Sequence, residues 1–560
     1  MSQMDPVKLE ILANALRSVT DETFVSLMKA AYSTNIKERK DHSTAILDRD
    51  CRLVAQTMAS PVHIASMTGL AETLKKRYGG EDGRFSSLTE GDMFVANDPH
   101  VAGGTHLPDV NIVAPVFVDG EIVAFVCNIA HHADIGGMAP GSMIGGMTEI
   151  YQEGLRIPLI RLYRAGELQQ DIFDLLLLNA RVPREREGDY FAQIAAARLG
   201  MRRLGEIVEK HGAGSVCEGF DQLIERTGMR FRSGIAEIAD GDYQFEDLID
   251  DDGCGTEDIR IKLAVEKRGE KISFDFDGTD PQMTGNLNVT MNATMASVCF
   301  ALQALIDPEC PNNQGLLDSV EISAPPGTAV NAVAPAAVAA RAHTCQRIID
   351  VVFGALAPAL PEQSLGASNG ANSTLVFSGT DPRSGSAYVY LETLGGGMGA
   401  RATKDGKDGV QVNMTNTSNL PVEAIELEYP LLVEEYGLVE DSGGAGRHRG
   451  GMGIRRSVRP VGHTTEFSGV GERFRHQPWG VFGGEAGAAG RFYITHADGS
   501  REVLGTKPSP APLMEDQAVT VETPGAGGYG SPKERSAEDV TNDRVSEKFS
   551  ASYIEEHYQG

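Results

Sequence analysis

Residues 98–134 hold the densest group of metal-binding and proton-transferring side chains in this chain of 560 residues. The segment combines histidines with carboxylates: Asp98, His100, His106, Asp109, His131, His132 and Asp134. Neutral imidazoles and carboxylates are the ligands that zinc and manganese take from proteins, and a catalytic site needs about three of them plus an open position. The segment therefore predicts a site for a divalent transition metal.

Two apolar, β-branched runs lie inside this segment, at residues 111–118 and 121–130. Asp119-Gly120 joins them, and this pair of residues is a strong signal for a two-residue hairpin turn. We therefore expect two buried antiparallel strands in which Val118 faces Glu121.

That register places Asp109 opposite Ala130, so that candidate ligands from both strands meet at the open end of the hairpin. In strict register His106 and His131 share one face, whereas Asp109 and His132 share the other. The proline before Asp109 cannot continue a central ladder, and the rule for faces weakens there. Spacing alone leaves open whether His131 or His132 is the ligand.

Several flanking elements must position these residues. Residues 6–34 show a helical period after an Asp-Pro start, and residues 62–78 predict a second helix that ends at Gly79-Gly80. Residues 43–56 predict a hairpin, and Asp41 directly precedes its first strand. Its side chain can therefore reach a neighbouring site.

The glycine-rich residues 133–158 follow the candidate ligands and form either a lid over the site or a surface connection. Residues 341–361 predict a further helix, with His343 as a cap or core residue. Seven further histidines are dispersed and are expected to have no part in the site: His63, His211, His448, His463, His476, His496 and His557.

The order of these patterns predicts an α+β, multi-domain chain. Residues 1–238 form a mixed α/β region that carries the metal site. Short alternating strands then predict a β-rich region over residues 239–525, and residues 526–560 form a C-terminal tail. Expected helices near residues 171–181 and 189–212 pack around the site region.

Composition excludes some classes of function. The formal net charge of −28 and the pI near 4.9 argue against a nucleic-acid partner, because phosphate contacts need an excess of lysine and arginine. No apolar run is long enough for a membrane span, and the N-terminus does not resemble a signal peptide. The seven cysteines are scattered singly, as in a reduced, cytoplasmic protein.

Glycine-dense segments at residues 395–401 and 443–453 invite comparison with phosphate-binding loops. Neither has the strand, loop and helix context of a dinucleotide fingerprint, and the sequence contains no G-x-x-x-x-G-K-[ST] motif. Turns and close backbone packing are the favoured interpretation. The sequence also shows no Ser-His-Asp constellation of the serine-hydrolase type.

Motifs in consistent order from about residue 4 to 535 resemble the hydantoinase B family. They include KERKDHSTAILD, NDPHVAGGTHLPDV, NIAHHADIGG, YQEGLRIP, ARAHTCQRIIDVV, DSGGAGRHRGGMG and PGAGGYGSP. That family comprises the smaller subunit of ATP-dependent N-methylhydantoinases, oxoprolinases and caprolactamase. It is related to the alpha subunits of acetone and acetophenone carboxylases.

The resemblance implies that ATP and Mg²⁺ bind to a partner A subunit, in an (AB)2 heterotetramer, and that this chain completes the reaction at zinc or manganese. Matching motif to motif, His106, Asp109 and His131 are the implied metal ligands. Asp41 is a fourth ligand or a nearby base. His132 is a second candidate for moving protons, and Asp134 either orients a histidine or supports the loop.

Three classes of function follow from the resemblance. The first is a subunit of an ATP-dependent hydrolase that opens cyclic amides such as hydantoins, 5-oxoproline or lactams. The second is the alpha subunit of an ATP-dependent ketone carboxylase, whose acetone-type members are considerably longer than 560 residues. The third is a non-catalytic scaffold for the A subunit.

Overall fold

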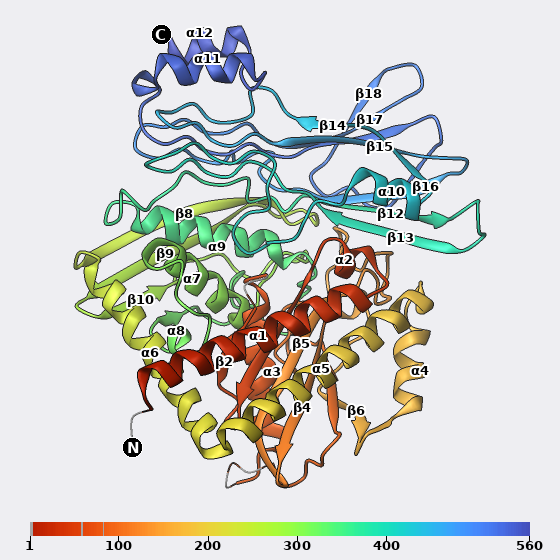
Figure 1. Cartoon of the computed structure of the whole chain (residues 1–560). Coiled ribbons are helices and arrows are strands. Elements are labelled where there is room, and N and C mark those ends of the chain that lie inside the picture. The colour runs from red at the N-terminus through yellow and green to blue at the C-terminus, as the bar shows by residue number, and fades with distance from the viewer. Residues whose placement is uncertain (1–3, 58–59, 82, 84, 560) are drawn as a thin grey trace.

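The computed structural model describes residues 4–57, 60–81, 83 and 85–559. Helix α1 and the first sheet occupy the lower half of Figure 1, and two further sheets with the C-terminal helices occupy the upper half. A fourth sheet and helices α7 and α9 lie between them. The predicted mixed fold is confirmed, and its four sheets are mostly antiparallel. The boundaries at residues 239 and 526 stay a prediction.

The first sheet has seven strands in the order β2-β1-β5-β4-β3-β6-β7, and every neighbouring pair is antiparallel. We call it the site sheet. Its strands are β1 (His42–Asp48), β2 (Leu53–Gln56), β3 (Met93–Ala96), β4 (Asp109–Val118), β5 (Glu121–His131), β6 (Ile160–Arg164) and β7 (Glu167–Leu168). The predicted hairpins β1–β2 and β4–β5 are both confirmed.

Helices cover both faces of the site sheet. Ile46, Ile112 and Val126 pack with α1 (Pro6–Ala30) and α5 (Pro183–His211). Leu47 and Phe125, their sequence neighbours, pack on the opposite face with α3 (His63–Tyr78). Because successive strand residues point to opposite faces, burial on both faces explains why these strands are continuously apolar. The remaining helices of this part are α2 (Thr34–Lys37), η1 (Ile150–Gln152), α4 (Gln170–Leu178) and α6 (Ala213–Glu237).

The second sheet has the order β11-β10-β9-β8, with β10 and β11 parallel. Its strands are β8 (Gly241–Asp251), β9 (Glu257–Arg268), β10 (Lys271–Asp275) and β11 (Glu321–Ser323). Helices α7 (Met291–Ile306), α8 (Gln314–Leu317) and α9 (Arg341–Leu356) accompany it. Their buried side chains share one core with the α3 face of the site sheet. The sequence patterns predicted α9 but not α6 or α7.

Two more sheets, of four and five strands, form the upper half of the molecule in Figure 1. The first contains β12 (Thr374–Thr380), β13 (Ala387–Thr393), β16 (Thr465–Val470) and β19 (Ala511–Leu513). The second contains β14 (Leu431–Leu438), β15 (Ile454–Pro460), β17 (Arg491–Thr495), β18 (Arg501–Leu504) and β20 (Ala518–Glu522). The helices here are α10 (Val422–Glu428), η2 (Pro532–Glu534), α11 (Ala537–Val545) and α12 (Ala551–Tyr558).

The glycine-dense segments pack backbone against backbone, as the sequence predicted. A methyl group built on Gly450 would lie 1.8 Å from the carbonyl oxygen of Ala526, and one built on Gly451 would lie 1.9 Å from that of Lys407. Only glycine permits such approaches. All seven cysteines are free thiols. Within the described residues, every helix is too short or too polar to cross a membrane.

Candidate metal centre

His106, Asp109 and His131 converge at one end of the inner strands β4 and β5 of the site sheet. One nitrogen or oxygen atom from each residue lies within 4.8 Å of the others, and all three side chains are buried. Asp109 is the first residue of β4, His131 is the last of β5, and His106 lies in the turn that leads into β4. We call these three residues the triad.

A β-bulge gives the hairpin the register that aligns two of the triad residues. Val118 pairs with Glu121 as predicted, but the register shifts by one residue between Val116 and Phe117. As a result Asp109 pairs directly with His131, and the predicted pairing of Asp109 with Ala130 is wrong. Cross-strand partners project to the same face, so the prediction that Asp109 and His131 occupy opposite faces is also wrong.

The protonation of His106 indicates a cation at this position. Its Nδ1 donates to the carbonyl oxygen of Ala339 at 2.8 Å, which leaves an unprotonated Nε2 in the neutral ring. Burial, followed by the charge of Arg341, lowers the pKa of His106 and so keeps the ring neutral. Nε2 lies 3.1 Å from Asp109 Oδ1 without the geometry of a hydrogen bond. Two lone pairs therefore face each other, an arrangement that a shared metal ion stabilises.

His131 is the second neutral imidazole. Burial lowers its pKa to about 3. Its Nε2 lies 3.3 Å from Sδ of Met143, and its Nδ1 is buried without a hydrogen-bond partner among the described residues. A buried, unpaired imidazole nitrogen is costly, and coordination to a metal would satisfy it.

Asp109 is held in its ionised form. Although burial alone would raise the pKa of Asp109, the positive charge of the Arg341 guanidinium beside it holds that pKa well below its usual range. The second carboxylate oxygen accepts hydrogen bonds from Arg341 Nη2 at 2.5 Å and from Thr105 Oγ1 at 3.3 Å. Oδ1 thus remains for a metal. Arg341 is the first residue of α9, and its distance in sequence from Asp109 explains why the sequence did not reveal it.

Asp41 and His63 extend the triad on one side. His63 Nε2 lies 3.6 Å from Asp41 Oδ1 and 4.0 Å from Asp109 Oδ1, and its Nδ1 shares a hydrogen bond of 2.8 Å with Ser43 Oγ. The backbone of Asp41 links the chain before β1 to the end of β5, because its carbonyl oxygen accepts the backbone N–H of His131. The prediction that His63 has no part in the site is wrong. The sequence offered one signal for His63: it lies at the start of the predicted helix 62–78, which follows the predicted hairpin beside Asp41.

The other four candidates from residues 98–134 lie outside this group: Asp98, His100, His132 and Asp134. His132 Nε2 shares a hydrogen bond of 2.9 Å with Gln193 Oε1, and its ring packs against Tyr190 of α5, on the opposite face from the triad. Asp134 accepts hydrogen bonds from Gly136, Gly141 and Arg181, and therefore supports the glycine-rich loop.

Asp98 accepts hydrogen bonds from the backbone N–H groups of His100 and Val101 and from Arg156. His100 Nε2 lies 2.9 Å from the carbonyl oxygen of Ala336. It therefore contacts the same 334–340 segment that orients His106.

Glu153 fixes the carbonyl group that orients His106. Its Oε1 accepts the backbone N–H groups of Val338 and Ala339 at 2.6 and 2.7 Å. Burial raises the pKa of Glu153 to about 8, although these two hydrogen bonds favour the ionised form. The residue lies in the YQEGLRIP motif and was not among the predicted site residues.

The triad lines a small cavity of about 30 Å³, which we call the inner cavity. Its walls come from distant parts of the chain: Asp41, Ser60, His63 and Met143 from one part, and Arg341, Asn372, Thr393, Thr415 and Thr417 from another. A cavity needs about 10–15 Å³ of free volume to hold one water molecule. The inner cavity can therefore hold an ion but not a ring-sized substrate.

The model of one protein family, hydantoinase B/oxoprolinase, matches residues 5–532. The chain belongs to this family. A 38% identical relative is an uncharacterised protein of Methanocaldococcus jannaschii, and the match covers 98% of this chain and 94% of the relative. The caprolactamase subunit beta of Pseudomonas jessenii is 31% identical over 96% of this chain and 92% of its own length. The family member 5-oxoprolinase 1 of Arabidopsis thaliana is 34% identical over 94% of this chain, which spans only 42% of that longer protein.

Two solved structures have the same fold as this family member. The crystal structure of the ATP-dependent caprolactamase from Pseudomonas jessenii superposes with a TM-score of 0.92 at 27% sequence identity, and covers 100% of this chain and 96% of that one. The nucleotide-free structure of acetone carboxylase superposes with a TM-score of 0.91, over 99% of this chain and 79% of that one. Its sequence identity is 17%, so this second match concerns the fold alone.

Proposed function

We propose that this chain is the B-type subunit of an ATP-dependent hydrolase that opens cyclic amides. The proposal rests on the buried group of His106, Asp109 and His131. Within it, the unprotonated His106 Nε2 lies 3.1 Å from Asp109 Oδ1, as two ligands of one metal ion would. The full-length similarity to a caprolactamase subunit supports the choice of reaction.

The chemistry of amides explains the need for ATP. An amide carbonyl is stabilised by resonance, and its nitrogen is a poor leaving group. Phosphorylation of the carbonyl oxygen makes the carbon far more electrophilic. The sequence contains no phosphate-binding loop, so we assign ATP and Mg²⁺ to an A-type partner subunit in an (AB)2 complex.

The triad residues would hold zinc or manganese, because two neutral imidazoles and one carboxylate suit either ion. The bound ion would supply Lewis-acid chemistry, by polarising the substrate oxygen and acidifying water. Arg341 holds Asp109 in place, and Ala339 holds the tautomer of His106. Such supporting hydrogen bonds fix the orientation of ligands.

We assign proton transfer to Asp41, which lines the inner cavity and retains some exposure. Burial works to raise the pKa of Asp41, but neighbouring charges lower it overall, so the carboxylate is ionised and able to accept a proton. His63, at 3.6 Å, is placed to receive or return that proton, and Ser43 orients its ring. His132 lies on the other face of the sheet, so its orientation does not support the same role.

The experiment is co-expression of the chain with its A-type subunit, followed by assays of hydantoin, 5-oxoproline, 2-pyrrolidinone and caprolactam. We expect ring opening that depends on ATP and releases ADP. His106→Ala and His131→Ala should abolish ring opening, because each removes a metal ligand.

Two other results would overturn the proposal. Incorporation of bicarbonate into a ketone, without ring opening, would identify a carboxylase. Full activity in both histidine variants would identify a scaffold whose partner performs the whole reaction.

A further inference from the structure

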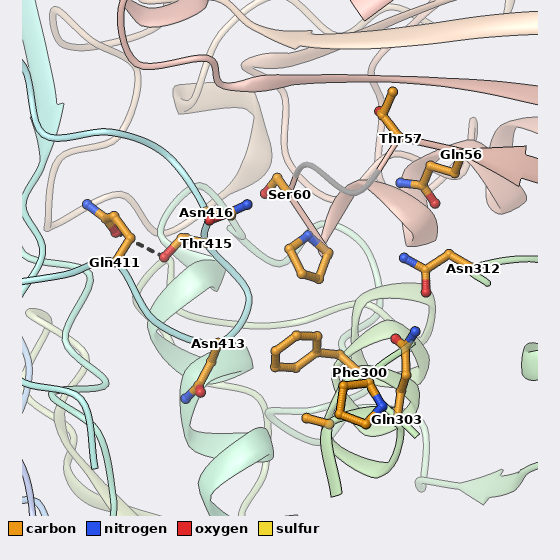
Figure 2. Close-up of a pocket in the computed structure, with 13 residues that line it drawn as sticks. Gln56, Thr57, Ser60, Phe300, Gln303, Asn312, Gln411, Asn413, Thr415 and Asn416 are labelled. Atoms are coloured by element: carbon orange, nitrogen blue, oxygen red, sulfur yellow. Dashed lines mark hydrogen bonds between the residues drawn. The ribbon is translucent and has the colours of Figure 1, made fainter. Parts of the chain in front are cut away.

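A second, larger chamber adjoins the inner cavity. It has a volume of about 270 Å³ and lies among the chain after β2, the C-terminal part of α7 and residues 411–416. Figure 2 shows Gln56, Asn312 and Gln303 along one side and Gln411, Asn413 and Asn416 along the other. Because pockets for drug-sized ligands measure roughly 300–1,000 Å³, this slightly smaller outer chamber suits a small ring.

Ser60 and Thr415 lie between the two spaces, since both residues line the inner cavity and the outer chamber. Ser60 Oγ donates to the carbonyl oxygen of Met414 at 3.2 Å, which links the chain after β2 to residues 411–416. The inner cavity is too small for a ring. A substrate whose reacting group points at the triad must therefore place the rest of its ring in the outer chamber.

The described residues that line the outer chamber carry no formal charge, although 23% of the whole chain is charged. Carboxamides and hydroxyls provide its polar groups, and Pro61, Phe300, Ala304 and Pro308 provide apolar surface. The charged residues belong to the inner cavity instead, where Asp41, Asp109 and Arg341 lie. The two spaces thus separate a charged reacting end from an uncharged remainder.

Hydrogen bonds fix two of the carboxamides in place. Gln303 Nε2 donates to the carbonyl oxygen of Cys310 at 2.6 Å. Gln411 Nε2 donates to the carbonyl oxygen of Thr393 at 2.8 Å, and its Oε1 accepts from Thr415 at 3.0 Å. The described lining residues thus offer dipoles in fixed positions, but no cation that could pair with an anionic substituent.

We infer that the outer chamber binds the ring of an uncharged cyclic amide and discriminates against rings that carry a carboxylate. This inference rests on the proposed function and narrows its substrate class to neutral lactams and hydantoin-type rings, as opposed to 5-oxoproline. The physical reason is desolvation: a carboxylate that enters the chamber loses water and gains no positive partner.

A matched pair of ligands tests the inference. 5-Oxoproline is 2-pyrrolidinone with one added carboxylate, so the two compounds differ only in the feature at issue. Their dissociation constants are measured on the full-length chain by saturation-transfer NMR. We expect 2-pyrrolidinone to bind at least about tenfold more tightly than 5-oxoproline. A tenfold ratio requires a difference of only about 1.4 kcal/mol in binding free energy. Asn416→Arg, at the exposed mouth, should reduce that ratio about fivefold or more by supplying a cation.

The control variant is Gln170→Arg, which adds the same charge on an exposed face of α4. It should leave the ratio unchanged. Gln303→Lys, which adds a cation on the opposite wall, should reduce the ratio in the same direction as Asn416→Arg. Equal or tighter binding of 5-oxoproline, no binding of either ring, or an unchanged ratio in both of these variants would overturn the inference. These binding results do not depend on turnover, so failure of ATP-dependent ring opening would count separately, against the proposed function.

Discussion

His106 Nε2 and Asp109 Oδ1 lie 3.1 Å apart with no proton to share, because the proton of His106 is on Nδ1, where Ala339 accepts it. The repulsion between these two atoms is the strongest physical sign of a metal ion in the described chain. A cation between them would convert an unfavourable contact into two bonds. Three predictions about the site depend on this geometry and on the residues that maintain it.

The first prediction concerns metal content. Purified chain should contain about one equivalent of zinc or manganese per molecule, measured by elemental mass spectrometry. Asp109→Asn should weaken metal binding by at least about tenfold, because it removes the anionic ligand. Loss of supporting residues near a metal costs roughly 10–100-fold in affinity, and loss of a ligand should cost no less.

His100→Asn is the matched control for metal content. His100 contacts the same 334–340 segment, through Ala336, but does not line the inner cavity. Its substitution should leave the metal in place. Equal metal content in Asp109→Asn and in the unmodified chain would contradict the assignment of the triad.

The second prediction separates the two roles considered for Asp41. If Asp41 is the base, Asp41→Asn should lower the rate of ring opening by about 10²–10⁴-fold and keep the metal. If it is a fourth ligand, metal content falls with the rate. We expect the first result, because Asp41 lies on the His63 side of the inner cavity and not among the three closest ligand atoms.

His132→Gln provides the comparison for Asp41→Asn. Since His132 bonds to Gln193 and packs on Tyr190, its loss should lower thermal stability while the rate per folded molecule stays near that of the unmodified enzyme. A loss of rate at full stability would instead support the role in proton transfer that the sequence suggested for His132.

The third prediction is a pH dependence of stability that arises from Glu153. Its pKa rises from 4.5 to about 8 on burial. A carboxyl group with a raised pKa favours the folded state below its unfolded pKa, and this contribution disappears as the pH rises through the folded value. The chain should therefore lose a few kcal/mol of stability between about pH 5 and 8.

Glu153→Gln isolates this effect, because the amide oxygen can still accept the N–H groups of Val338 and Ala339 but cannot ionise. Thermal melting from pH 5 to 9 should be flatter in the variant, which should be the more stable protein at pH 8. Parallel pH profiles for the two proteins would exclude Glu153 as the source.

The sequence predicted the triad and most local elements, but not the contacts that complete the site. Hydrophobic period and turn signals identified the hairpin that carries Asp109 and His131. The hairpin prediction missed the bulge between Val116 and Phe117, although Pro115 lies directly before it and a proline inside a strand is typical of edges and bulges. Arg341 reaches the triad from 232 residues away, and such pairings arise from the tertiary fold, which periodicity does not report.

The final prediction concerns the glycine-dense segments. Gly450→Ala would place a methyl carbon 1.8 Å from the carbonyl oxygen of Ala526. Two backbones must then separate, and overpacking of this kind costs roughly 1–3 kcal/mol or more. Gly505→Ala is the control, since a methyl group there meets no atom within 4 Å. Thermal melting should show a lower transition temperature for Gly450→Ala and little change for Gly505→Ala. Equal transition temperatures would mean that the segments are loosely packed.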